Sequence, residues 1–527
     1  MRYLYAMTSV LRRGGAGLVL VVALALTAHA QDKLGKVDFP ISCTAPAQQE
    51  FNRAVALLHA FEYGAAQSVF TTVADSDPTC AMAYWGLAMT QWPQLWTSPT
   101  KTQFEVGAAA LARAKVLGAR SERERDWVAA IDHIFVDASR SYGVRTRVYE
   151  QAMARMARLY PSDREVVLFH ALALQVIAPP TDRAHTLQLR SARIIEKIFA
   201  EQPDHPGAAH YLLHAYDTPA LAPRALPAAR RYEQLAQSLP HALHMPSHIY
   251  SLLGLWEDSV RANRASEAAA RAMGEVPEEF HAIDYLVYAH LQLAQDVEAR
   301  RAIDRMRRPQ SLDARSMPVF YAFAAGPARY AVERRRWADA AALAVVPSPL
   351  PFADALTVFA RALGAARSAN PAGARQEIQR LDTLREAAGA TPYWRRQIDV
   401  QRGAAAAWVA LAEGNPKEAE RLMRDAAALE DANERHSVTP GVIVPARELL
   451  GDLLRETKQP ALALAAYEAS LRREPNRFNG IYGAARAAEL AGNREKARAY
   501  YEKLLALAAN ADTERPEVRE AKAYLGR

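Results

Sequence analysis

The feature of the sequence that most restricts its fold is a self-similarity with a period of 34 residues near the carboxyl end. The segment 444–477 and the 34 residues after it carry alanine and tyrosine at matching positions, Ala463 with Ala497 and Tyr467 with Tyr501. Repeats of this length are typical of stacked helix hairpins, because one hairpin cannot bury its apolar face alone. The pattern therefore predicts an array of helix pairs.

The same frame occurs near the amino end of the chain. Ala66, Phe70 and Pro78 fall at the corresponding positions, and Tyr84 restarts the pattern. This arrangement resembles the tetratricopeptide-repeat family, in which small residues let two helices approach, an aromatic ring fills the gap to the next hairpin and proline stops the second helix. The resemblance implies an all-α fold, a right-handed superhelical solenoid of helix hairpins.

The resemblance is strong at both ends of the chain, fair for residues 145–300 and weak for 310–440. Composition and spacing then divide the sequence into consecutive segments. We expect a signal peptide at 1–30, N-terminal repeats at 31–200, histidine-rich repeats at 201–310, degenerate helical repeats at 311–440, and a C-terminal repeat pair with its tail at 441–527.

The first 30 residues have the features of an export signal. Arg12 and Arg13 precede the short apolar run Leu18–Leu26, and the sequence AHA at 28–30 is a small-x-small cleavage motif. We expect cleavage after Ala30 and a periplasmic or secreted protein. No later run has about 20 uninterrupted apolar residues, so no membrane span is expected.

The two cysteines suit an oxidising compartment. Cys43 precedes the first expected helix, and Cys80 opens the helix one repeat later, so stacking brings them close. We predict a disulfide between them; two buried free thiols are the alternative. The formal net charge of +7 includes three leader arginines and falls to about +4 without them, with acidic residues interspersed throughout. Nucleic-acid binding is therefore not expected.

Histidine is the unusual component of the repeats. His210 and His214 lie one turn apart on an expected helix, and His241, His244 and His248 follow with spacings of three and four. Imidazoles at such spacings share one helix face and can hold a borderline divalent metal. The proline at 246 either kinks the second helix or begins a new one.

Repeat alignment extends this histidine pattern into the next repeat. His281 and Asp284 take the positions of His241 and His244, so three consecutive first helices carry ligand-type side chains that can converge on one point. The candidate ligands for zinc or copper are His210, His214, His241, His244, His248, His281 and Asp284.

Three interpretations of these side chains stay open: a hydrogen-bonded polar seam, a metal site or a catalytic site. The stretches 206–232 and 240–256 resemble a group of secreted bacterial tetratricopeptide-repeat proteins of unassigned activity, which implies fold and export but no mechanism. The first functional hypothesis is an exported scaffold that binds a protein or peptide partner in its concave groove. The alternative is a metal-binding or metal-dependent protein, and the sequence leaves open whether it is an enzyme.

Overall fold

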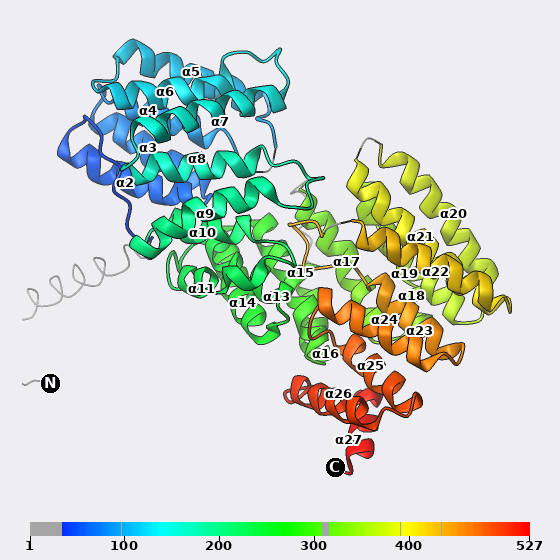
Figure 1. Cartoon of the computed structure of the whole chain (residues 1–527). Helices are drawn as coiled ribbons and strands as arrows, with labels where there is room; N and C mark the ends of the chain where they lie inside the picture. The colour runs from blue at the N-terminus through cyan, green and yellow to red at the C-terminus, as the bar shows by residue number, and fades with distance from the viewer. Residues whose placement is uncertain (1–33, 96, 308–315, 390, 434) are drawn as a thin grey trace, which may run out of the picture.

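The computed structural model describes residues 34–95, 97–307, 316–389, 391–433 and 435–527. The predicted signal peptide lies outside the described residues. Every regular element within these ranges is a helix, and helices that follow one another along the chain pack together as hairpins. Figure 1 shows these hairpins succeeding one another from the blue amino-terminal end, through the green middle, to the red carboxyl end.

The helices of the first half of the chain are short to medium in length. They are α2 (Ala45–His59), α3 (Tyr63–Ser76), α4 (Ala81–Thr90), α5 (Lys101–Leu117), α6 (Glu122–Phe135), α7 (Tyr142–Leu159), α8 (Arg164–Val176), α9 (Thr186–Glu201), α10 (Pro206–Ala215), α11 (Ala222–Tyr232), α12 (Pro240–His244), α13 (Pro246–Leu252) and α14 (Trp256–Met273).

The helices of the second half continue the same order of pairs. They are α15 (Val276–Gln292), α16 (Asp296–Met306), α17 (Met317–Glu333), α18 (Trp337–Ala341), α19 (Pro351–Arg367), α20 (Pro371–Ala387), α21 (Pro392–Ala412), α22 (Pro416–Asp431), α23 (Ala446–Glu456), α24 (Pro460–Arg473), α25 (Phe478–Leu490), α26 (Arg494–Leu507) and α27 (Pro516–Leu525).

Close packing of the hairpins depends on glycines that face aromatic rings, as the repeat pattern predicts. A Cβ atom added to Gly86 would lie 2.3 Å from the ring of Phe70 on the preceding helix. Tyr467 of α24 lies between Gly451 of its own hairpin and Gly483 of the next, and neither position has room for a Cβ atom. The predicted fold class, an all-α solenoid of stacked helix hairpins, is confirmed.

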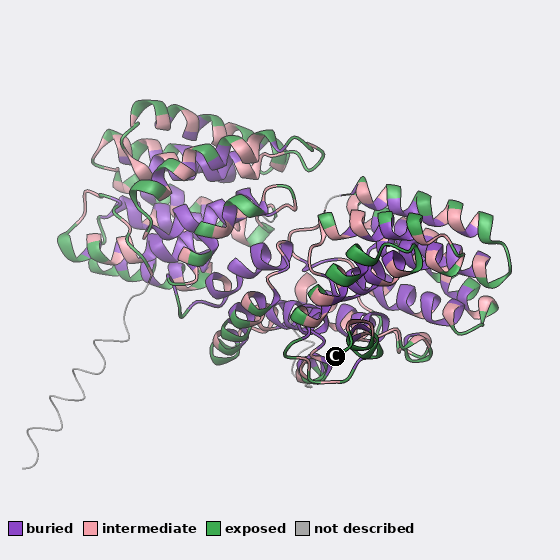
Figure 2. Ribbon diagram, turned by 60° about the horizontal axis from the view of Figure 1, so that its bottom comes forward, coloured by how far each residue is buried: buried purple, intermediate pink, exposed green. Residues whose placement is uncertain are grey.

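Helix α15 is buried over most of its length. Every residue from Phe280 to Gln292 is buried, so this helix is enclosed on all sides. Figure 2 shows buried residues concentrated on the inner sides of the helices and exposed residues on the outer sides. Polar side chains on α15 must therefore find partners inside the protein.

A crossing segment, residues 435–445, runs from the end of α22 back to α15. In Figure 1 it is the orange loop beside the α15 label. The Gly441 carbonyl oxygen accepts a hydrogen bond of 2.6 Å from Arg329, and a Cβ atom at Gly441 would lie 2.8 Å from the Tyr288 hydroxyl. The crossing segment thus packs against α15 and α17.

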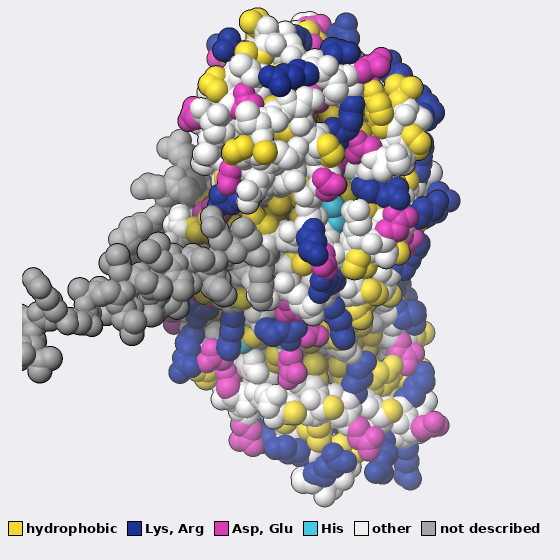
Figure 3. Space-filling model, turned by 90° about the vertical axis from the view of Figure 1, so that its left-hand side faces the viewer, with side chains coloured by type: hydrophobic (Ala, Val, Ile, Leu, Met, Phe, Trp, Pro, Cys, Tyr) yellow, Lys and Arg dark blue, Asp and Glu magenta, His cyan; other side chains and the backbone are white. Residues whose placement is uncertain are grey.

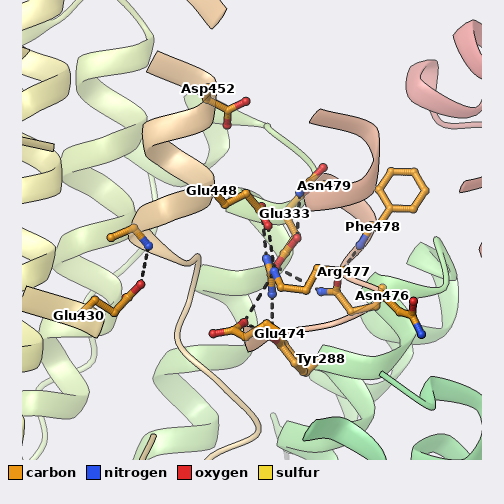
Figure 4. A network of polar contacts seen from close by, with 12 residues as sticks. Tyr288, Glu333, Glu430, Glu448, Asp452, Glu474, Asn476, Arg477, Phe478 and Asn479 are labelled. Carbon is orange, nitrogen blue, oxygen red and sulfur yellow. Dashed lines mark hydrogen bonds and ion pairs between the residues drawn. The ribbon is translucent and has the colours of Figure 1, made fainter. Parts of the chain in front are cut away.

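A buried ionic network holds the carboxyl-terminal hairpins against the middle of the chain (Figure 4). Arg477, which is 0% exposed, donates to Glu333 at 2.5 Å, to Glu448 at 3.0 Å and to the Tyr288 hydroxyl at 2.7 Å. These partners come from α17, α23 and α15. Asn479 adds a hydrogen bond of 2.8 Å to Glu333. The network joins segments that lie up to 189 residues apart in the sequence.

The amino-terminal repeats are joined covalently. Cys43 and Cys80 form a disulfide with their Cα atoms 5.3 Å apart, which ties the segment before α2 to the start of α4. A disulfide is typical of proteins in an oxidising compartment. None of the helices in the described ranges combines the length and the apolar character that a membrane crossing requires.

Candidate metal centre

The sequence-predicted histidines lie on neighbouring helices in the middle of the chain. Met245 separates α12 from α13, so Pro246 begins a new short helix instead of kinking a longer one. Few histidine side chains are visible on the face in Figure 3, where basic and acidic groups are interspersed. The positions are His210 and His214 on α10, His241 and His244 on α12, His248 on α13, and His281 on α15.

The repeat alignment predicts that these imidazoles can converge on one point. They instead form two groups of three. The inner triad is His244, His248 and His281, and the outer triad is His210, His214 and His241. Within each triad, one ring nitrogen from each residue lies within 4.8 Å of the other two. The inner triad is entirely buried, whereas two members of the outer triad are half-buried.

Hydrogen bonds determine which ring nitrogens of the inner triad carry protons. His244 Nδ1 lies 2.6 Å from Oδ1 of Asn263, whose amide nitrogen donates to the Ser259 carbonyl oxygen. His248 Nδ1 lies 2.9 Å from a carboxylate oxygen of Asp217. Both partners accept, so both Nδ1 atoms carry the proton, and each neutral ring has only a lone pair at Nε2.

The two lone pairs face each other. The Nε2 atoms of His244 and His248 are 2.9 Å apart. Burial lowers the pKa of His244 well below its usual value, and burial also lowers the pKa of His248 although Asp217 opposes the shift. Two neutral acceptors at this distance repel each other unless a cation lies against both. The arrangement is therefore suited to a bound cation.

His281 supplies the third imidazole. Its ring centre lies 4.1 Å from that of His244 and 5.9 Å from that of His248. Burial lowers the pKa of His281 to about 3, so this ring is also neutral at physiological pH. The ring of Tyr285 packs against all three imidazoles. Neutral imidazoles are the form in which histidine binds zinc and copper.

Asp217 connects the inner triad to the crossing segment. Its second carboxylate oxygen accepts a hydrogen bond of 2.7 Å from Arg435. Burial opposes ionisation of Asp217, but His248 and Arg435 outweigh it and hold the pKa of this carboxyl below its usual value. A carboxylate in this position fixes the tautomer and orientation of a metal-binding histidine. Sequence reasoning missed this pair, since 218 residues separate its members and no local pattern marks Arg435.

The outer triad has a related arrangement. His210 Nδ1 donates a hydrogen bond of 2.7 Å to the His59 carbonyl oxygen, so its Nε2 has a lone pair, which lies 3.1 Å from Nε2 of His214. Burial lowers the pKa of both rings well below the usual value. The His241 ring centre lies 5.2 Å from that of His210, and Phe61 packs against all three rings.

A third group, His59, Glu165 and His205, shows what a polar seam looks like in this protein. Nε2 of His59 and Nε2 of His205 each donate to a separate oxygen of Glu165, at 2.8 and 2.9 Å. His59 Nδ1 accepts from the Tyr211 hydroxyl at 2.8 Å, and His205 Nδ1 accepts from the Ala208 amide. Every donor meets an acceptor, so this group joins α2, α8 and α10 without needing an ion.

Asp284 lies apart from the imidazoles. Its carboxylate forms a buried ion pair with Arg329, which also binds the carbonyl oxygen of Gly441. The pair anchors the crossing segment to α15. We therefore leave Asp284 out of the ligand set, although its sequence position matches that of a histidine in the preceding repeat.

Comparison with known proteins adds little to this geometry. No model of a protein family matches the chain, and no curated protein matches it. Among solved structures, the chain is similar to the crystal structure of the APC/C hetero-tetramer Cut9–Hcn1, over 91% of this chain and 83% of that one. The TM-score is 0.33 and the sequence identity is 11%, so no inference about function follows.

Proposed function

We propose that this protein binds a transition metal ion through His244, His248 and His281. The observation that carries the proposal is the 2.9 Å separation of two Nε2 atoms whose rings both use Nδ1 as a donor. Tetrahedral zinc with bonds of about 2.0–2.1 Å to nitrogen places two ligand atoms roughly 3.3 Å apart, so a small outward movement of the two rings admits the ion. Three imidazoles favour zinc or copper and leave one tetrahedral position for water or a further ligand.

A shared proton is the other cation that could lie between the two rings. This proton would place a positive charge on His244 or His248, and burial lowers the pKa of both rings. The nearest carboxylate, Asp217, is already paired with Arg435. Protonation near neutral pH is therefore unfavourable, whereas a metal ion binds the neutral rings as they are.

The test is the zinc or copper content of the purified full chain, by elemental analysis after dialysis with each metal. The wild type should retain metal in stoichiometric amount. His244→Ala/His248→Ala should remove the equivalent held by the inner triad, because two of its three ligand atoms are gone.

His290→Ala is the matched control, since this histidine is also buried and its ring, among the described residues, hydrogen-bonds to Gln295. It should keep the wild-type metal content. A folded wild type that retains no metal, and whose melting temperature ignores added zinc and copper, would contradict the proposal.

The scaffold hypothesis is a second proposal with a weaker basis. A solenoid of helix hairpins is a fold that proteins use to hold partners, and this supports binding of a protein or peptide. However, the crossing segment packs against α15 and α17 and covers helix surface that a partner would otherwise contact. A scaffold without a metal function predicts a metal-free wild type in the same elemental analysis.

We also propose that the chain is exported to the periplasm or beyond the cell, like the secreted bacterial group that it resembles. The leader pattern at 1–30 and the Cys43–Cys80 disulfide support this. The intact mass of the exported protein should correspond to a chain beginning at Gln31, with two hydrogens fewer than the reduced form. An uncleaved or fully reduced chain would count against export.

A further inference from the structure

Two buried carboxylates lie beside the outer triad. Oε1 of Glu62 has no hydrogen-bond partner among the described residues, and this side chain is only 7% exposed. Oε2 of Glu278 is buried as well and lies 3.8 Å from Nδ1 of His241, which is beyond hydrogen-bonding distance. The outer triad is thus flanked by two carboxylates, each with one buried oxygen that has no hydrogen-bond partner among the described residues.

Such oxygens are costly inside a protein unless a cation is near. One ring nitrogen from each histidine of the outer triad lies within 4.8 Å of the other two. The three imidazoles of the outer triad and the carboxylates beside them form a set of electron-pair donors that a divalent cation can bind.

The outer triad is built together with the inner one. His241 and His244 are three residues apart on α12, so they lie on one side of that helix and each supplies one triad. Glu278 and His281 have the same spacing on α15. Glu278 Oε2 lies 3.8 Å from Nδ1 of His241, so α15 places Glu278 beside the outer triad and His281 in the inner one.

We propose that His210, His214 and His241, with Glu62 and Glu278 as carboxylate donors, hold a second metal ion beside the one in the inner triad. The proposal rests on the proposed function, because it makes the outer triad the second half of a two-metal centre. Helices α12 and α15 then each contribute one group to each half. His210 is already oriented for this role, since its Nδ1 donates to a backbone carbonyl oxygen, as metal-binding histidines do.

The donor chemistry distinguishes the two ions. The inner triad offers three neutral imidazoles, and its nearby carboxylate, Asp217, binds the outer nitrogen of His248 instead of facing the ion. The outer triad adds carboxylate oxygen, which favours zinc over softer cations such as cuprous copper. The second site is therefore the one expected to prefer Zn²⁺.

The number of zinc ions per chain tests the second site. The full chain, stripped with chelator, is dialysed against Zn²⁺ and analysed for bound metal. The wild type should hold two equivalents. His210→Ala/His214→Ala should hold one, and His244→Ala/His248→Ala should also hold one, because each pair removes two ligands of one triad only.

Glu62→Gln is the variant that is least disturbing to the fold, since it keeps the shape of the side chain and removes the charge. It should retain the melting temperature of the stripped wild type and bind the second equivalent at least about 10-fold more weakly, while the first is unchanged. It therefore remains informative if the double histidine variants fail to fold.

The outcomes separate this inference from the proposed function. One zinc per wild-type chain, lost in His244→Ala/His248→Ala and unaffected by Glu62→Gln, would overturn the second site and leave the first standing. A folded wild type that holds no zinc would overturn both. Two equivalents in the wild type, of which Glu62→Gln weakens one, would support the two-metal centre.

Discussion

Replacing Arg477 by methionine should lower the free energy of unfolding by about 3–5 kcal/mol, measured by urea denaturation. The guanidinium is 0% exposed and is the shared donor for Glu333 and Glu448. Methionine fills much of the volume but leaves two buried carboxylates without their cation. Burial, together with the charge of Glu333, raises the pKa of Glu448 to about 7 although Arg477 opposes the shift. Without the arginine, the two carboxylates must either take up protons or separate from their neighbours, which opens the contact between the hairpins.

The matched control for this prediction is Arg261→Met, because Arg261 pairs with Glu233 at the surface and is 56% exposed. Its effect should be below about 1 kcal/mol. The triple change Arg477→Met/Glu333→Gln/Glu448→Gln should recover part of the loss, since it removes the unpaired charges. If Arg477→Met were no more destabilising than Arg261→Met, the network would not hold the carboxyl-terminal hairpins in place.

Replacing Asp217 by alanine should weaken Zn²⁺ binding at the inner triad by about 10–100-fold in Kd, measured by competition with a chelator. Asp217 does not face the ion. It accepts the Nδ1 proton of His248 at 2.9 Å and is itself held by Arg435. Without it, the ring can rotate or change tautomer, and Nε2 loses its fixed direction.

Two variants separate positioning of the ring from general destabilisation. Asp217→Asn keeps an oxygen acceptor and should lose less affinity than Asp217→Ala. Asp217→Ala/Arg435→Met removes the buried unpaired guanidinium and should restore the melting temperature of the stripped protein without restoring Kd. Asp258→Ala, at a surface ion pair, should leave both quantities unchanged. Wild-type Zn²⁺ affinity in Asp217→Ala would contradict the role given to this carboxylate.

The helix hairpins could be predicted because their signal is local. Phe70 with Gly86, and Tyr467 with Gly451 and Gly483, meet within one or two helices of each other, and the 34-residue period places them in the sequence. The region 311–440 lacks this period. The crossing segment, which begins at the end of this region, could not be predicted, because its partners Tyr288 and Arg329 lie more than a hundred residues away.

The sequence by itself determined that this chain is an array of helix pairs, and that histidines recur on three consecutive first helices of that array. Both follow from spacing along one helix, which is a property of the local backbone. Only the tertiary structure decided how the imidazoles are divided between two triads, and that His59 belongs to a satisfied seam instead. It also brought Asp217 together with Arg435. Such pairings depend on how whole hairpins turn against one another, and many weak packing contacts set that angle.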